Sequence, residues 1–259
     1  MDALSLLKLA LVPLAVGLAS LAARRWGHTV SGYLGGMPMV GGPIIIFLAI
    51  DHGAAFAAKV ALVTLAGLLA QAAHQIAMAY VGRRFGWLAG LLGGWGAFAI
   101  VGVLLAHLEF PGWVAATYGV AALLVMWRVL PRAKDDGALP AVPRIELALR
   151  MAAAFAIAAV ILWGSTRFGP VVSGVLLSVP VTGSVIPPFT LKLYGPEALA
   201  RVQRGFLTGL TGFASFFLVV GVALVPLGLA AGFALALIAA LAAVSVFSRF
   251  GKRNVVGDD

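Results

Sequence analysis

The chain has 259 residues, of which 62% are hydrophobic and only 10% are charged, and its mean hydropathy is +1.07. Soluble domains carry about a quarter of charged residues, so this composition excludes a protein that is covered by a water-facing surface. The absence of cysteine excludes disulfides, thiolate metal sites and thiol catalysis. The net charge of +9 does not indicate a nucleic-acid partner, because the basic residues fall in short loops between apolar stretches. The sequence therefore predicts an all-α polytopic membrane protein whose main partner is the lipid bilayer.

Nine apolar stretches are predicted to cross the membrane, each close to the ~20 residues that span a bilayer core. In chain order they are 4–23, 27–50, 55–81, 87–108, 113–130, 145–163, 168–191, 198–220 and 221–247. The first stretch lacks the basic region and cleavage site of a signal peptide, so we expect it to be retained as a span. The only linker-like segment is 131–144, PRAKDDGALPAVPR, and the last span is followed by a short polar tail.

Lysine and arginine are distributed unevenly between the two sides of this predicted topology. Of the 18 basic residues, 15 fall on the side of the C-terminus, and only Lys8, Lys59 and Arg167 fall on the other side. By the positive-inside rule, the C-terminus and the linker are cytoplasmic and the N-terminus is outside. Adding or removing a span near the middle would scramble this segregation, so the charges favour an odd number of spans.

An internal repeat is found when the chain is shifted by 142 residues. Without a gap, RWGHTVSGYLGGMPMVGGPIIIFLAIDHG aligns with RFGPVVSGVLLSVPVTGSVIPPFTLKLYG, and 16 of the 46 positions from 25 to 70 are identical. Chance would give roughly one identity in ten in so biased a composition. Five predicted spans separate equivalent points, and an odd number places the copies in opposite orientations, as in many secondary transporters. We expect a first four-span repeat in 1–110, a connecting span and cytoplasmic linker in 111–143, and a second four-span repeat with the tail in 144–259.

The second half also resembles a known family. The segments RIELALRMAAAFAIAAVILWGSTRFG, PVTGSVIPPFTLKLYG and FASFFLVV are similar to the GlpM-like family of small four-span bacterial membrane proteins, whose activity is undefined. The first half is related to that family only through the internal repeat, and VPVTG at 179–183 matches only part of the family's PFPTF-like segment. The resemblance implies a duplicated four-helix unit in the bacterial cytoplasmic (inner) membrane, and it transfers no function.

Two predicted spans carry helix-breaking residues at matching positions near the middle of the membrane. They form two candidate substrate-binding segments: Pro38, Gly41, Gly42 and Pro43 in the second span, and Pro180, Thr182, Gly183 and Ser184 in the seventh. Unwound backbone at membrane depth is tolerated only against protein or a water-filled cavity, and paired interruptions in two halves indicate a transporter's binding site. The alternative is a pair of kinked helices that pack closely, helped by Gly32 and Gly36.

A polar cluster in the third predicted span breaks the symmetry between the halves. Gln71, His74 and Gln75 share one helix face, because they stand at positions i, i+3 and i+4. The equivalent positions in the second half are Phe213, Phe216 and Phe217. Polar side chains inside a membrane often mark a pathway, so these three residues are further candidates for substrate binding. The alternative is that they only hydrogen-bond neighbouring helices.

The inverted repeat and the paired breaks favour a secondary transporter or facilitator for a small polar or anionic solute. We expect no catalytic residues, because no nucleophile–base pair or intramembrane carboxylate dyad is visible. We expect no metal site or cofactor, because the four histidines have no consistent spacing. The alternative function is a non-transporting scaffold or lipid-binding subunit of an envelope biosynthetic assembly. The sequence leaves the substrate, the coupling ion, the direction of transport and the oligomeric state open.

Overall fold

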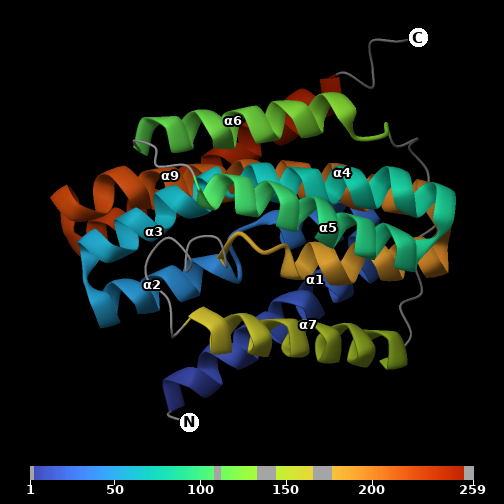
Figure 1. Cartoon of the computed structure of the whole chain (residues 1–259), viewed down its shortest axis with the longest axis horizontal. Coiled ribbons are helices and arrows are strands. Elements are labelled where there is room, and N and C mark those ends of the chain that lie inside the picture. Colours follow the sequence, from blue (N-terminus) through green and yellow to red (C-terminus); the bar gives the residue numbers. More distant parts are fainter. Residues whose placement is uncertain (1–2, 108–111, 133–143, 166–176, 254–259) are drawn as a thin grey trace.

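A computed structural model describes residues 3–107, 112–132, 144–165 and 177–253, and each of its regular elements in these ranges is a helix. The first half of the predicted seventh span therefore lies mostly outside the described residues. In chain order the helices are α1 (Ala3–Gly36), α2 (Gly41–His52), α3 (Ala54–Ala66), α4 (Leu68–Phe85), α5 (Trp87–Ala106), α6 (Gly112–Val129), α7 (Arg144–Ser165) and α9 (Val181–Arg253). Most of them run along the long axis of the molecule, and the marked ends of the chain lie on opposite sides of the bundle, N below and C above in Figure 1.

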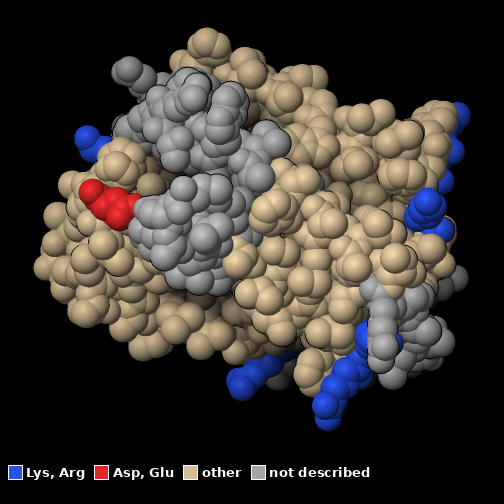
Figure 2. Space-filling model, turned by 90° about the horizontal axis from the view of Figure 1, so that it is seen from below, with Lys and Arg blue, Asp and Glu red and all other residues tan. Residues whose placement is uncertain are grey.

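The outside of this bundle is suited to lipid. In the described chain, the helical stretches long and apolar enough to cross a bilayer are Pro13–His52, Ala54–Phe85, Trp87–Leu105 and Val181–Arg249. Large apolar side chains such as Leu92, Ile100 and Ile238 are more than 60% exposed. The described part of the face in Figure 2 is mostly uncharged, and its lysines and arginines lie near the margins. The chain is therefore an all-helical membrane protein, as its composition predicts.

Glycines interrupt the long helical stretches. The glycines with a positive φ, between 75° and 90°, are Gly27, Gly53, Gly86, Gly195 and Gly228. Without such interruptions α9, with 73 residues, would be about 110 Å long, against ~30 Å for a bilayer core. The chain turns back at Gly228. This is shown by the closeness of the segments on either side, since a Cβ on Gly232 would meet Leu224 of the preceding segment. The boundary between the last two predicted spans is expected at 220–221, and the turn falls later than that. The sequence could not place it, because the apolar run contains no polar residue that marks its end.

The last part of α1 packs very closely on the middle segment of α9. Gly32 and Gly36 of α1 face Gly205 and Gly209 of α9, and a Cβ on any of the four would overlap the opposite backbone. Lipid is as apolar as these helices, so burial of apolar surface gives little driving force for their association. Close backbone contact through small residues at four-residue spacing stabilises the pair instead.

Polar contacts join α4, α6 and α9 at one end of the bundle. The guanidinium of Arg204 donates to the carbonyls that end α6 and follow it, namely those of Trp127 at 2.9 Å, Pro131 at 3.0 Å, and Leu130. The hydroxyl of Tyr80 donates to the carbonyl of Val129 at 2.6 Å. Arg83 and Glu197 form an ion pair at 3.3 Å. A cation on the last carbonyls of a helix is favourable, because that end carries the negative pole of the helix dipole.

Candidate functional site

The two helix breaks are short turns between well-formed helices. α1 ends at Gly36, the chain turns through 37–40, and α2 begins at Gly41. Helical geometry is absent again at 178–180, and α9 begins at Val181. The breaks are thus shorter than the predicted segments. The first turn of α2 contains Gly41, Gly42 and Pro43, and the first turn of α9 contains Thr182, Gly183 and Ser184. A proline in the first turn is tolerated because the N–H it lacks would have no partner within the helix.

The two turns close in the same way. In each turn, the N–H of the residue after the proline donates to the carbonyl of the residue before the proline. The N–H of the fourth residue after the proline donates to the carbonyl of the proline itself. The distances are 2.8 and 2.7 Å in both turns, for Met39–Met37 and Gly42–Pro38 in the first and for Val181–Val179 and Ser184–Pro180 in the second. Each residue of the second turn stands 142 positions after its counterpart in the first.

Thr182 brings the second break into contact with the first. Its buried Oγ1 donates a hydrogen bond of 2.6 Å to the carbonyl oxygen of Gly35. Gly35 lies in the last turn of α1, where the carbonyls have no partner within the helix. The hydroxyl therefore satisfies an acceptor that the break in the first half has exposed. A Cβ on Gly35 would also lie within contact distance of Ile186, so the two broken helices pack against each other at this point.

The predicted polar cluster of α4 lies on the second break. His74 Nε2 and Ser184 Oγ are 3.4 Å apart, a hydrogen bond whose donor depends on the histidine tautomer. The side-chain nitrogen of Gln75 occupies the space that a Cβ on Gly183 would need. Gln71, on the same face of α4, is 5% exposed, and the other two side chains of the cluster are fully buried.

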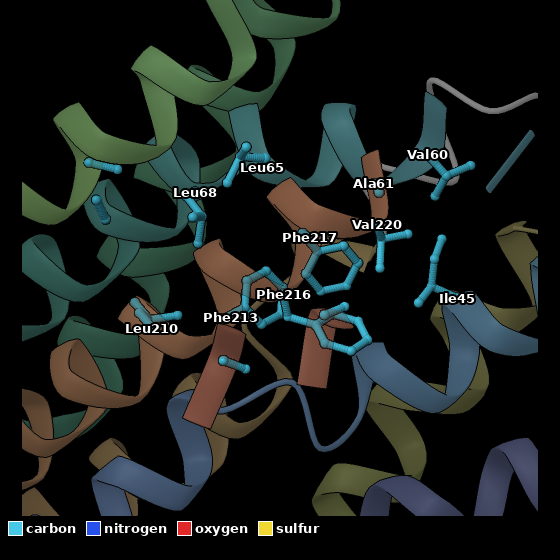
Figure 3. Close-up of a cluster of buried hydrophobic side chains, with 14 of the residues drawn as sticks. Ile45, Val60, Ala61, Leu65, Leu68, Leu210, Phe213, Phe216, Phe217 and Val220 are labelled. Carbon is cyan, nitrogen blue, oxygen red and sulfur yellow. The ribbon is translucent and has the colours of Figure 1, made fainter. Parts of the chain in front are cut away.

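The equivalent positions on α9 lie on the first break. Phe213 and Phe217 pack against Gly41, and Phe216 packs near Gly42. The ring centroids of Phe213 and Phe217 are 4.4 Å apart, and those of Phe216 and Phe217 are 5.4 Å apart. Figure 3 shows the three rings among apolar side chains of α2, α3 and α9. We call these three phenylalanines the aromatic wall.

The structure adds one polar residue that the sequence analysis missed. Gln203 of α9 is 1% exposed, and its Nε2 donates to the backbone carbonyl of Gln75 at 2.9 Å and lies 3.5 Å from the Oε1 of that residue. A single glutamine in a long apolar span is a weak signal by itself. The internal repeat carries a stronger one, because the residue 142 positions earlier is Ala61. One half thus has an alanine and the other a glutamine at the equivalent position, which indicates that the surroundings of this position differ between the halves.

Several polar atoms of this cluster are buried without a hydrogen-bond partner. They are Gln71 Oε1, His74 Nδ1, Gln75 Nε2 and Gln203 Oε1. Each unpaired buried group costs about 1–3 kcal/mol. The cost falls where a polar partner, such as an ordered water or a solute, pairs with these atoms.

Two prolines in α9 free further acceptors at the same place. Pro187 and Pro188 lie inside the helix and have no N–H. The carbonyls four residues earlier, those of Gly183 and Ser184, therefore receive no α-helical hydrogen bond. Both carbonyls belong to the turn that His74 and Gln75 contact. The second break thus combines side-chain and backbone acceptors, whereas the first break faces phenyl rings.

Metal chemistry has no support from the described residues, among which no group of three or more His, Asp or Glu side chains is placed to hold an ion. No protein-family model, no curated protein and no solved structure matches this chain. The contacts at the two breaks are therefore the basis for any functional inference.

Proposed function

We propose that this chain is a secondary membrane transporter or facilitator that binds a small polar or anionic solute near the membrane midplane, between its two broken helices. The observation that carries the proposal is the contact of the two breaks through Thr182 and Gly35, next to a buried polar cluster with unpaired atoms. Broken helices that meet at mid-membrane are the usual place for substrate in secondary transporters. A scaffold would gain no stability from unpaired polar atoms in its interior.

An inverted repeat within about nine spans is the second part of the proposal. Local features that recur at an offset of 142 residues support it: the positive-φ pairs Gly53/Gly195 and Gly86/Gly228, the two turns, and the contacts Gly36–Gly209 and Ser178–Gly67. Each of the two contacts joins the broken helix of one half to the other half. Two such units, related by an axis in the membrane plane, could expose the site to each side in turn by rocking against one another.

The proposed orientation in the bacterial inner membrane has the C-terminus in the cytoplasm and the N-terminus outside. The proposal is supported by the 15 basic residues that fall on the side of the C-terminus in the predicted topology, among them Arg83 and Arg204. Reporter fusions after Arg84, Gly137 and Asp259 should all report the cytoplasm, and a fusion near Glu109 should report the outside. A cytoplasmic signal from the Glu109 fusion would refute this topology.

Solute uptake into proteoliposomes tests the proposed function. The purified chain should move at least one solute from a panel of small polar and anionic molecules faster than protein-free liposomes do. Size-exclusion chromatography of the reconstituted protein shows whether it is folded. If folded protein moves none of the panel, the scaffold or lipid-binding alternative takes the place of the transporter.

A further inference from the structure

We propose that the solute is uncharged and rich in hydrogen-bond donors, as a primary amide, urea or a small polyol is. This inference rests on the proposed function and narrows its substrate class. It follows from three features of the second break: its side chains, the N-terminus of α9 and the charges nearby.

The side chains at the second break carry no fixed charge. They are two hydroxyls, three amides and an imidazole: Thr182, Ser184, Gln71, Gln75, Gln203 and His74. The atoms without partners include two amide oxygens, Gln71 Oε1 and Gln203 Oε1, and one amide nitrogen, Gln75 Nε2. With the carbonyls freed by Pro187 and Pro188, acceptors outnumber donors. A ligand that donates several hydrogen bonds and accepts at least one is the complement of this arrangement.

The N-terminus of α9 does not turn the site into an anion site. Two of the first backbone N–H groups, those of Val181 and Ser184, are already bonded to the carbonyls of Val179 and Pro180. The remaining dipole effect is at most about 2 kcal/mol at a buried helix end. Taking an anion out of water without a counter-charge costs several kcal/mol. Desolvation therefore outweighs the dipole, and the acceptor-rich lining repels negative charge.

Three basic groups have described contacts with neighbouring helices. Arg204 is bonded to the carbonyls at the end of α6, and Arg83 is paired with Glu197. The buried Arg150 of α7 donates to Ser20 of α1 at 3.3 Å. The described contacts of Arg83 and Arg204 lie outside the polar cluster. A bare cation would match the oxygens but would leave Gln75 Nε2 without an acceptor.

The test compares uptake of radiolabelled urea, acetamide and glycerol with uptake of acetate, phosphate and sodium ions into proteoliposomes. At least one neutral solute should enter faster than into protein-free liposomes, and the three ions should not. Gln71→Met removes one unpaired acceptor at similar volume, and Gln203→Met removes another together with the bond of its Nε2 to the carbonyl of Gln75. Each should slow uptake of the neutral solute about 2- to 10-fold, the equivalent of one hydrogen bond. Two separate variants are used so that one still reports if the other fails to fold.

Thr208→Val is the matched control, because the Thr208 hydroxyl is bonded within its own helix, to the carbonyl of Arg204 at 3.2 Å. Its uptake rate should equal that of the wild type. Uptake of acetate, phosphate or sodium without any neutral solute would overturn this inference and leave the transporter proposal standing. Neutral uptake that neither methionine variant slows would also overturn it, since the solute would then pass elsewhere. No uptake of any solute by folded protein would refute the proposed function itself.

Discussion

The aromatic wall on α9 and the polar cluster on α4 stand at equivalent positions of the two halves and pack against equivalent helix breaks, but they differ in energetic cost. The three rings of the wall are packed on each other and on glycines, and none of them has a polar atom to satisfy. The cluster packs just as closely on Gly183 and Ser184 but leaves polar atoms unpaired. A fold that only needed to fill this space could have used phenyl rings twice.

The magnitudes show which region serves stability. Aromatic pairs contribute about 0.5–1.5 kcal/mol each beyond the area that they bury. Four unpaired polar atoms cost about 1–3 kcal/mol each unless an occupant pairs with them. The wall therefore contributes stability, whereas the cluster contributes less unless a polar partner pairs with its atoms. Such a cost at a buried position is what the proposed binding of a solute there would require.

The largest expected effect concerns the close contacts that hold the two regions in place. On the side of the wall, Gly209 meets the backbone of α1, whereas on the side of the cluster, Gly67 meets the side chain of Ser178. Gly209→Ala should force two backbones apart and cost 3 kcal/mol or more, roughly the upper range for overpacking. Gly67→Ala should cost less, because a side chain can move. Thermal unfolding in detergent, followed by size-exclusion chromatography, measures both.

The double variant Gly67→Ala/Ser178→Gly separates overpacking from a general loss of helix quality. Removing the serine side chain makes room for the new methyl group, so the double variant should regain part of the stability that Gly67→Ala loses. No comparable rescue exists for Gly209→Ala, where the opposing atoms are main chain. If Gly67→Ala proved the more damaging of the two alanine variants, the contrast between the two contacts would be wrong.

The second prediction tests the energetic difference between the two regions at one pair of equivalent residues. Phe217→Ala removes a fully buried ring and should destabilise the protein by about 3–5 kcal/mol. Gln75→Leu removes an unpaired amide nitrogen and should be neutral or should stabilise by about 1 kcal/mol, while it slows uptake. Thermal unfolding and proteoliposome uptake on the same preparations measure both effects. A Gln75→Leu protein that is as unstable as Phe217→Ala would show that the cluster is a packing contact.

Much of this comparison could be predicted from the sequence, because both the breaks and the polar cluster differ from an apolar background. Pro38 and Pro180 stand out through their shared offset, and Gln71, His74 and Gln75 through their spacing. The limits of the breaks were harder to predict. A proline or glycine near a helix break can belong to the break itself or to the first turn of the helix that follows, and the sequence fits both positions equally well.

Tertiary contacts explain what the sequence did not reveal. Gln203 joins the site because α9 packs beside α4, and no local pattern on α9 marks it. Arg150 lies in a predicted span and is counted with the cytoplasmic basic residues, but it is 1% exposed and its guanidinium lies over the ring of Phe189 at 5.6 Å. A long basic side chain near a helix end can extend to water or turn inward, and its neighbours on other helices decide between the two.

The third prediction compares function at another equivalent pair. His74→Ala removes the partner of Ser184 and an unpaired ring nitrogen, so it should slow uptake by about tenfold or more, as loss of a polar group in a binding site does. Phe216→Ala should change uptake far less once both rates are corrected for the amount of folded protein. Equal losses in the two variants would mean that the polar cluster and the aromatic wall have the same role.

The smallest expected effect concerns the bond between the two breaks. Thr182→Val keeps the shape of the side chain but leaves the carbonyl of Gly35 without its hydroxyl donor. A buried hydrogen bond contributes about 0.5–1.5 kcal/mol net, and the unpaired acceptor adds to the loss, so we expect destabilisation by about 1–2 kcal/mol. The residue 142 positions earlier is Val40, so the variant gives the second half the side chain of the first. Val40→Thr, the reverse exchange, adds a hydroxyl to a half-buried residue and serves as the matched control, with little expected change in stability.

If the two broken helices move relative to each other during transport, the bond exists in only part of the cycle, and Thr182→Val should change the uptake rate as well as the melting temperature. A lower melting temperature with an unchanged uptake rate would place the bond among the static contacts of the fold.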